Sequence, residues 1–251
     1  ANLSRYSFWS NNMSFSCLKD GKKIYSFQYT PAQWLELRAQ RSQLDLEMPC
    51  CGVPAILKTS SLGTQFFAHK SKQDQNCHAS DGESAEHIFA KYLVSKALYE
   101  EKWQVETEKR GQTEDGKGWI ADIYANRADI SKGIVVEVQW SAQSYEQTVY
   151  RQSLYDQSNI RCVWLFRNGR QRKSTNALTG HYAQRTKALP VFTLTKAEDK
   201  SFRVHNIYIQ PNDDEAPVAI SMELKDFVKC LFSKGLEFIP KGDCSEYLRS
   251  E

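Results

Sequence analysis

The sequence lacks the features that would place it in a membrane or mark it as a strongly charged nucleic-acid binder. No apolar run approaches the roughly 20 residues that a membrane-spanning helix needs. The polar start of the chain has no apolar signal-peptide core. The net charge is only +3, too small to indicate nucleic-acid binding by itself. We therefore expect a cytoplasmic protein with no membrane span, whose 251 residues form one large domain or two small ones.

The sequence also lacks the signs of a disulfide framework. It has seven cysteines, an odd number. Without a secretion signal, reduced thiols are expected instead of disulfides.

Acidic residues are missing from one long basic stretch. There is no Asp or Glu between residues 157 and 197, whereas Arg or Lys occurs at positions 161, 167, 170, 172, 173, 185, 187 and 196. Such a segment is usually a solvated loop, but it also suits contact with phosphates. We favour a DNA clamp over a hinge for residues 167–187.

Low-complexity linkers and internal repeats are absent too, and the residue patterns divide the chain into three parts. Residues 1–80 predict short strands and turns with one helix near 31–41. Residues 81–167 predict a helix (82–100), three strands (103–109, 119–125 and 133–139), a second helix (144–156) and a strand (161–166). Residues 168–251 predict two strands (190–195 and 202–210), a further strand (219–222) and a helix (224–234), as an accessory layer. A strand–helix–strand unit favours a crossover onto a mixed sheet, so the expected fold class is α/β.

Two strands of the middle part each carry a carboxylate in an apolar run. Asp122 lies in Ile-Ala-Asp-Ile-Tyr, and Glu137 lies in Ile-Val-Val-Glu-Val-Gln. A buried carboxylate is costly unless it is paired or binds a metal. We therefore predict that both acids hold one Mg²⁺ or Mn²⁺ ion, with the carbonyl of Val138 completing the protein ligands. The alternative is that the acids lie at strand ends, solvated or paired with arginines.

Gln139 follows Glu137 by two residues and so lies on the same face of the strand. The pattern D…E-x-Q is a variant of the D…(D/E)-x-K pattern of metal-dependent nucleases, which hydrolyse phosphodiester bonds with a divalent cation. An amide can orient the attacking water, but it cannot supply the positive charge of lysine.

The first helix of the middle part carries a polar stripe. Glu83, His87 and Lys91 are four residues apart and share one face. We predict that His87 supports catalysis and Lys91 binds substrate, although both fit ordinary surface positions. Glu83 also fits a capping box with Ser80, which makes it the weaker member of the stripe.

The N-terminus of the second helix is a candidate phosphate-binding site. Ser144 is a candidate N-cap, and a helix N-terminus beside the metal strand suits an anion. Ser141 and Arg151 are therefore candidate substrate-binding residues, Arg151 through a two-pronged grip on phosphate. An exposed helix arginine is the commoner explanation.

The N-terminal part contains a candidate zinc set. Cys50, Cys51, His69 and Cys77, with His78 beside the last, offer enough thiolate and imidazole ligands for structural zinc. Adjacent cysteines do not make the usual C-x₂-C knuckle, and free buried cysteine is common.

Taken together, the motifs resemble the CoiA-type competence nuclease family over about residues 47–235. The similar segments are the helix motif at 83–91, A-D-I-Y (121–124), V-E-V-Q-W-S (136–141) and V-W-L-F (163–166), with Arg151, Tyr155 and a C-terminal match at 220–231. E-x-Q is also found in that family. P-C-C-G (49–52) and F-A-H (67–69) match its N-terminal segment, but Met48 replaces the first Cys of its C-P-x-C. The resemblance implies a restriction-endonuclease-like fold with a zinc-ribbon-like N-terminal region and a DNA substrate. It also implies a role in processing incoming DNA, with recombination or DNA-uptake proteins as partners.

The sequence therefore predicts a Mg²⁺- or Mn²⁺-dependent deoxyribonuclease acting on single- or double-stranded DNA. One alternative is a DNA-binding adaptor with weak or no catalysis, which Gln139 favours. A second is a nuclease that acts in defence or for a mobile element. A third, a metal-free protein-interaction domain, is disfavoured by the acids in the apolar strands.

Overall fold

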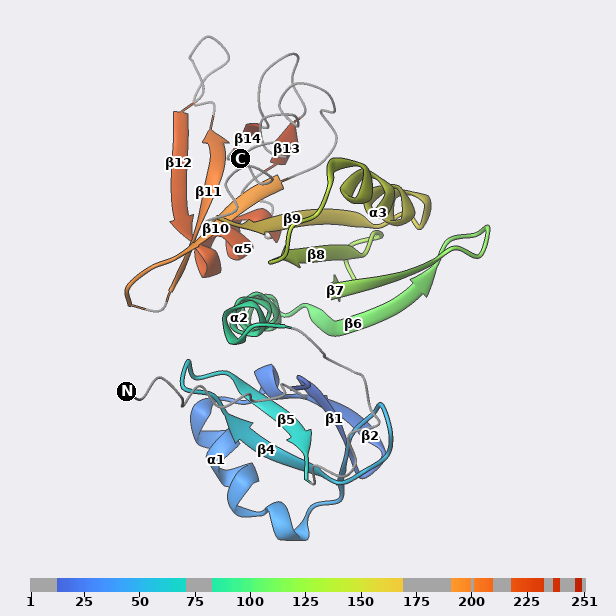
Figure 1. The fold of residues 1–251 in the computed structure, drawn as a ribbon, viewed down its shortest axis with the longest axis vertical. Coiled ribbons are helices and arrows are strands. Elements are labelled where there is room, and N and C mark those ends of the chain that lie inside the picture. Colours follow the sequence, from blue (N-terminus) through green and yellow to red (C-terminus); the bar gives the residue numbers. More distant parts are fainter. Residues whose placement is uncertain are drawn as a thin grey trace, which may run out of the picture. The chain divides into compact units, whose positions relative to one another are not determined.

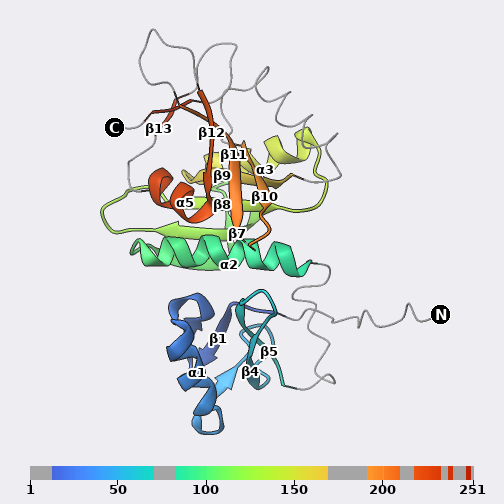
Figure 2. The same cartoon turned by 90° about the vertical axis from the view of Figure 1, so that its left-hand side faces the viewer.

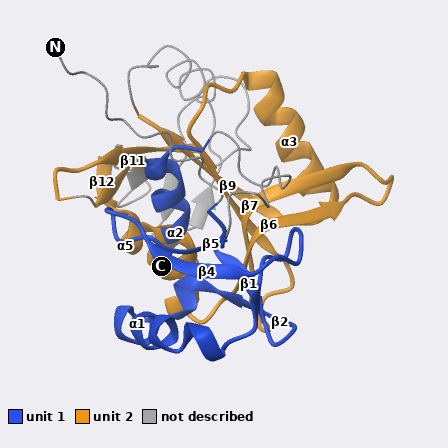
Figure 3. Ribbon diagram, turned by 60° about the horizontal axis from the view of Figure 1, so that its bottom comes forward, with its two compact units in different colours: residues 1–92 blue, residues 93–251 orange. Residues whose placement is uncertain are grey.

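The computed structural model describes residues 13–70, 83–168, 191–199, 201–209, 218–232, 237–239 and 247–249. The chain forms two compact units, Ala1–Tyr92 and Leu93–Glu251 (Figure 3). No described helix is long and apolar enough to cross a membrane. The three-part division of the sequence stays a prediction.

The first unit is built from short strands around a small aromatic core. Its elements are β1 (Ser16–Lys19), β2 (Lys22–Tyr25), η1 (Ser26–Gln28), α1 (Pro31–Ala39), η2 (Arg41–Gln43), β3 (Leu46–Glu47), β4 (Ala55–Thr59) and β5 (Gln65–His69) (Figure 1). One sheet has the order β2-β1-β3, and β4 and β5 form an antiparallel hairpin. Trp34 of α1 packs edge-on against Phe67 of β5 with ring centroids 5.1 Å apart. The predicted β-rich region with one helix is confirmed for residues 13–70.

Local sequence signals explain where α1 and α2 (Ala85–Glu100) begin. In α1, Thr30 accepts a hydrogen bond from the Gln33 amide, and Pro31 occupies the first helical position. In α2, the Ser84 hydroxyl accepts from the amide of His87 at 3.2 Å, which makes Ser84 the N-cap. The predicted capping box was therefore wrong, because Glu83 precedes the cap instead of lying inside the helix.

The second unit contains a mixed sheet. Its elements after α2 are β6 (Gln104–Gln112), β7 (Gly118–Asn126), β8 (Ile134–Gln139), α3 (Tyr145–Gln157), β9 (Arg161–Arg167), β10 (Val191–Lys196), β11 (Phe202–Ile209), β12 (Val218–Glu223), α5 (Leu224–Phe232), β13 (Glu237–Ile239) and β14 (Tyr247–Arg249). The order is β13-β14-β11-β10-β9-β8-β7-β6, with β12 beside β11 (Figure 1). The predicted succession of helix, three strands, helix and strand is confirmed, and β8 and β9 are parallel as a crossover requires.

The strands expected to form an accessory layer are part of this same sheet. β10 pairs in parallel with β9, and β11 pairs antiparallel with β10. The apolar residues of β10, buried from Val191 to Leu194, explain the difference, because they continue the buried centre of the sheet. The accessory-layer interpretation was wrong for these two strands.

Helices α3 and α5 cover opposite faces of the sheet. Trp164 of β9 faces α3, where its indole N–H donates to Gln152 at 2.9 Å. Phe192 of β10 pairs in register with Leu165, the neighbour of Trp164, and so points to the other face. There it packs against Phe227 of α5 with ring centroids 4.8 Å apart. In Figure 2, α5 and α3 lie on the two sides of strands β8 and β9. The centre of the sheet is thus buried on both sides.

Candidate functional site: a carboxylate group where two strands separate

Strands β7 and β8 are paired only at one end. Their ladder consists of three residue pairs, Ile123↔Val136, Tyr124↔Val135 and Ala125↔Ile134. Beyond Ile123, side chains take over the main-chain groups that a longer ladder would have paired. The Asp122 carboxylate accepts a hydrogen bond from the Val138 amide at 2.8 Å. The hydroxyl of Tyr155 in α3 donates to the Ile120 carbonyl at 3.1 Å. The two predicted acids therefore lie where the strands separate.

Glu137 is a fully buried carboxylate that the protein itself compensates. Its Oε2 forms an ion pair with Arg151 Nη2 at 2.6 Å, and its Oε1 accepts a hydrogen bond from the Tyr155 hydroxyl. The alternative interpretation of the sequence, in which an acid is paired with an arginine, is thus confirmed for Glu137. We call Asp122, Glu137, Arg151 and Tyr155 the carboxylate site.

The environment of Glu137 favours its protonated form. Burial raises the pKa of Glu137 to about 8, and the nearby negative charge of Asp122 adds to the effect. Arg151 and the Tyr155 hydrogen bond oppose the rise. The Tyr155 hydroxyl has one proton for two acceptors, the Ile120 carbonyl and Glu137. The hydroxyl therefore links the end of the short ladder to Glu137.

Arg151 is held from three sides. Besides Glu137, its Nη1 donates to Gln143 Oε1 at 3.1 Å, and its guanidinium lies over the Trp164 ring, 5.1 Å from the centroid. Gln143 in turn donates to the hydroxyl of Thr148 at 2.8 Å. The guanidinium group is thus engaged with Glu137. The predicted contact of Arg151 with phosphate stays a prediction.

Gln139 and Ser141 contact one another at the end of β8. The Gln139 amide nitrogen donates to the carbonyl and hydroxyl oxygens of Ser141 at 2.9 and 3.0 Å. This holds the nitrogen and leaves the amide oxygen as the atom that can accept a hydrogen bond from water. The predicted N-cap of α3 is confirmed, because Ser144 Oγ accepts from the Gln147 amide.

Sequence reasoning missed two residues of this region. Tyr155 was noted only as part of a family match, although it is one helical turn beyond Arg151, a spacing that places both on one face. Glu108 in β6 fits the polar alternation of its strand, so no sequence signal marked it. Its backbone has φ 51°, an uncommon conformation for a residue other than glycine. Its carboxylate lies within 4.8 Å of that of Asp122.

The polar stripe of α2 is connected within the first unit. Glu83 Oε1 pairs with Lys91 Nζ at 3.0 Å and with His87 Nδ1 at 3.2 Å. Lys91 is buried, with 2% of its surface exposed, so it is not the surface lysine of the alternative interpretation. The predicted roles of the three residues in catalysis and phosphate binding stay predictions.

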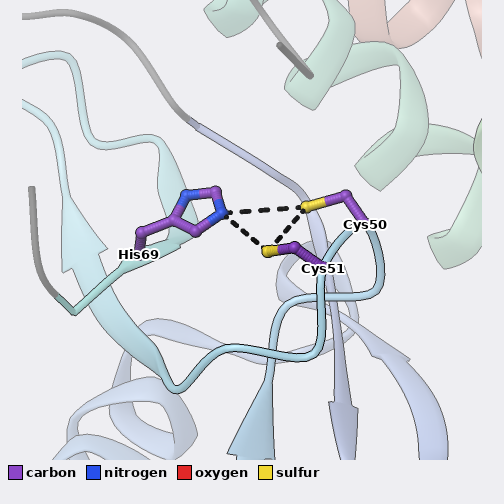
Figure 4. A group of neighbouring side chains, drawn as sticks. All are labelled: Cys50, Cys51 and His69. Carbon is purple, nitrogen blue, oxygen red and sulfur yellow. Dashed lines mark hydrogen bonds between the residues drawn. The ribbon is translucent and has the colours of Figure 1, made fainter. Parts of the chain in front are cut away.

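Two cysteine side chains and one histidine side chain of the first unit point toward one another (Figure 4). Cys51 Sγ lies 3.2 Å and Cys50 Sγ 3.7 Å from His69 Nε2, and the two sulfur atoms are 3.6 Å apart. We call Cys50, Cys51 and His69 the thiol site. The other predicted ligand, Cys77, and its neighbour His78 lie outside the described residues. The cysteines that the structure describes, at positions 17, 50, 51, 162 and 230, are free thiols.

Comparison with family models matches just over half of the chain. The nuclease-like domain of the competence protein CoiA matches residues 83–216. The chain belongs to the CoiA family. The matched part contains the whole carboxylate site and extends through β10 and β11, whose strands continue the sheet. Membership in the CoiA family makes the domain nuclease-like.

Other comparisons add little to the CoiA assignment. No curated protein matches the chain. A solved structure titled as a protein of unknown function, AF1548, is 10% identical, with a TM-score of 0.29. The match covers 46% of this chain and 61% of that one, so the chain spans less than two thirds of it.

Proposed function

We propose that this CoiA-family chain is a divalent-metal-dependent deoxyribonuclease with a restriction-endonuclease-like core. The observation that carries the proposal is that Asp122 and the buried Glu137 lie close together where β7 and β8 separate. Two hard oxygen ligands from neighbouring strands fit Mg²⁺ or Mn²⁺, which take few protein carboxylates. The Val138 carbonyl would be the third protein ligand. When bound, the metal supplies positive charge for the phosphoryl oxygens and lowers the pKa of a coordinated water.

The residues around the acids have separate tasks in this proposal. Tyr155 and Arg151 hold the Glu137 carboxylate in place from two sides, so that its position is fixed before any ion arrives. Gln139 accepts a hydrogen bond from the attacking water through its amide oxygen, because Ser141 holds its nitrogen. A lysine at this position could only donate. Gln139 thus orients the water but supplies no positive charge. We therefore expect slower cleavage than a lysine at this position would give.

The match to a competence protein supports our proposal for the substrate and biological role. We infer DNA as substrate, His87 and Lys91 as supporting residues of the helix motif, and incoming or foreign DNA as the target. Recombination or DNA-uptake proteins would then be its partners. A DNA-binding adaptor without useful catalysis is the second candidate, because Gln139 lacks the positive charge of lysine.

The test is cleavage of single- and double-stranded DNA by the purified chain with Mg²⁺, with Mn²⁺ or with chelator. We expect metal-dependent cleavage that falls about 100- to 1000-fold in Asp122→Asn and Glu137→Gln, the size typical for loss of a group that stabilises the transition state. Glu114→Gln, an exposed acid of the β6–β7 hairpin, is the matched control and should cleave normally.

Two outcomes would overturn the proposal as stated. Cleavage that survives unchanged in both variants would show that the acids do not carry it. Salt-sensitive DNA binding without cleavage under any metal would favour the adaptor. Circular dichroism and thermal unfolding of each variant separate loss of chemistry from loss of fold.

A further inference from the structure

The three side chains of the thiol site have the separations of ligands around one ion. Zinc binds thiolate sulfur at about 2.3 Å and imidazole nitrogen at about 2.0–2.1 Å, tetrahedrally. Those bond lengths place two sulfur ligands about 3.8 Å apart and a sulfur and a nitrogen about 3.5 Å apart. The distances here are 3.6 Å between the sulfur atoms and 3.7 and 3.2 Å to His69 Nε2. We propose that Cys50, Cys51 and His69 supply three of the four ligands of a Zn²⁺ ion.

The turn that carries the two cysteines is built to present both thiols. The Met48 carbonyl accepts hydrogen bonds from the amides of Cys51 and Gly52, at 3.3 and 2.8 Å, and the Met48 amide donates to the Val53 carbonyl. Gly52 adopts φ 70°, which glycine tolerates without strain. The turn thereby closes tightly, with both cysteines exposed on its outside. Adjacent cysteines can then serve as ligands without the spacing of a usual knuckle.

His69 reaches the thiols from the end of β5 and presents Nε2 to them. The side chain is 9% exposed, and its Nδ1 is buried without a hydrogen-bond partner among the described residues. The ring is therefore engaged through Nε2, the atom that faces the two sulfurs (Figure 4). A buried imidazole directed at two thiols is a donor set that suits zinc better than a hard cation. The separation of the sulfurs also shows that the two cysteines are not joined, since a disulfide bond is about 2.05 Å long.

Such an ion would cross-link the first unit. The cysteine turn joins β3 to β4, and His69 is the last residue of β5, opposite Ala55 in the hairpin. One ion would thus fix the β3–β4 turn to the end of the hairpin. A small unit with a limited core gains more from such a link than a large one. This proposal does not depend on the nuclease, because its ligands and its test are separate.

The test is the metal content of the full chain, purified without a histidine tag, by elemental mass spectrometry. We expect about one zinc per chain. His69→Asn, which keeps the size but removes the ligand, and Cys51→Ser should lose most of it. His69→Cys, which restores a ligand, should retain zinc, and so should the matched thiol control Cys230→Ser.

Cobalt exchange keeps the test decisive if a variant fails to fold. Co²⁺ added to the wild-type chain after zinc removal should give the visible and sulfur-to-metal absorption bands of a tetrahedral thiolate site. Wild-type protein without stoichiometric zinc and without these bands would overturn the proposal. Retention of full zinc by folded His69→Asn and Cys51→Ser chains would overturn it as well. DNA cleavage is not a readout here, so failure of the zinc site and failure of the nuclease remain distinguishable.

Discussion

The carboxylate site and the thiol site differ in the burial and the contacts of their side chains. Glu137 is fully buried, and the protein compensates its charge with Arg151 and a hydrogen bond from Tyr155. Cys50 and Cys51 are exposed, and their sulfur atoms lie close to each other and to His69 Nε2. In our proposals, the charge of Glu137 is compensated without an ion, whereas the thiol site would gain its link from one. A metal would therefore serve chemistry in one unit and stability in the other.

The strongest way to break this comparison is to remove all metal. With chelator present, we expect amide protection in residues 48–69 to fall about tenfold or more, because the link between turn and hairpin is lost. Protection in residues 119–164 should stay unchanged, since Arg151 and Tyr155 hold Glu137. Hydrogen exchange read by mass spectrometry measures both segments in one sample. Equal loss in both would show that the carboxylate site also needs an ion to fold.

A smaller effect is expected from deleting the internal compensation. At pH 9, above the raised pKa of Glu137, Arg151→Ala leaves the ionised carboxylate buried without its partner, and we expect the free energy of unfolding to fall by about 3 kcal/mol, the low end for a broken buried pair. The low end applies because the Arg151 side chain is 32% exposed. Mg²⁺ should restore part of this loss, since a cation at the two acids replaces the guanidinium charge.

Urea unfolding with chelator and with Mg²⁺ measures both parts of that prediction. Lys117→Ala, which breaks an exposed pair with Asp115, is the control and should cost less than about 1 kcal/mol. The double variant Arg151→Ala/Glu137→Gln should recover much of the loss, because no charge remains unpaired. A double variant as unstable as Arg151→Ala would show that packing, and not charge, explains the effect.

The finest distinction is a pH dependence that only the carboxylate site should show. Because the pKa of Glu137 is raised to about 8 in the folded chain, the folded state holds a proton that the unfolded state releases near its ordinary value. This proton stabilises the fold at low pH, and the contribution is lost as pH rises from about 4.5 to about 8. In metal-free protein, the wild type should therefore lose stability over this range relative to Glu137→Gln. Parallel curves for the two proteins would contradict it.

Residue periodicity predicted most elements of both units, because their cores are made by local alternation of apolar and polar residues. Strands β7 and β8, helix α3 and strand β9 all lie where the patterns placed them. Strands β13 and β14 were not predicted. Periodicity also did not show that β10 continues the sheet beside β9, since strand pairing depends on contacts between distant residues.

The sequence likewise predicted the site residues that carry a local signal, but not the contacts between distant residues. Asp122 and Glu137 were found because a carboxylate in an apolar strand is conspicuous. The early end of the β7–β8 ladder was not predictable from the sequence. The contact of Arg151 with Glu137 was not predictable either, because an arginine on a helix has many partners within reach. Cys50 and Cys51 were recognised by residue type alone, and their meeting with His69 depends on how the turn closes against the β5 strand.

The short ladder between β7 and β8 also has a consequence for how the chain folds. The β6–β7 hairpin closes through contacts between nearby residues and can form early, whereas β8 and β9 must first be brought together across α3. Only three residue pairs join the hairpin to β8, so few main-chain hydrogen bonds resist local opening of this junction. Asp122 and Glu137 come from opposite sides of it. Local opening of the junction would therefore move the two acids apart while the rest of the sheet stays paired.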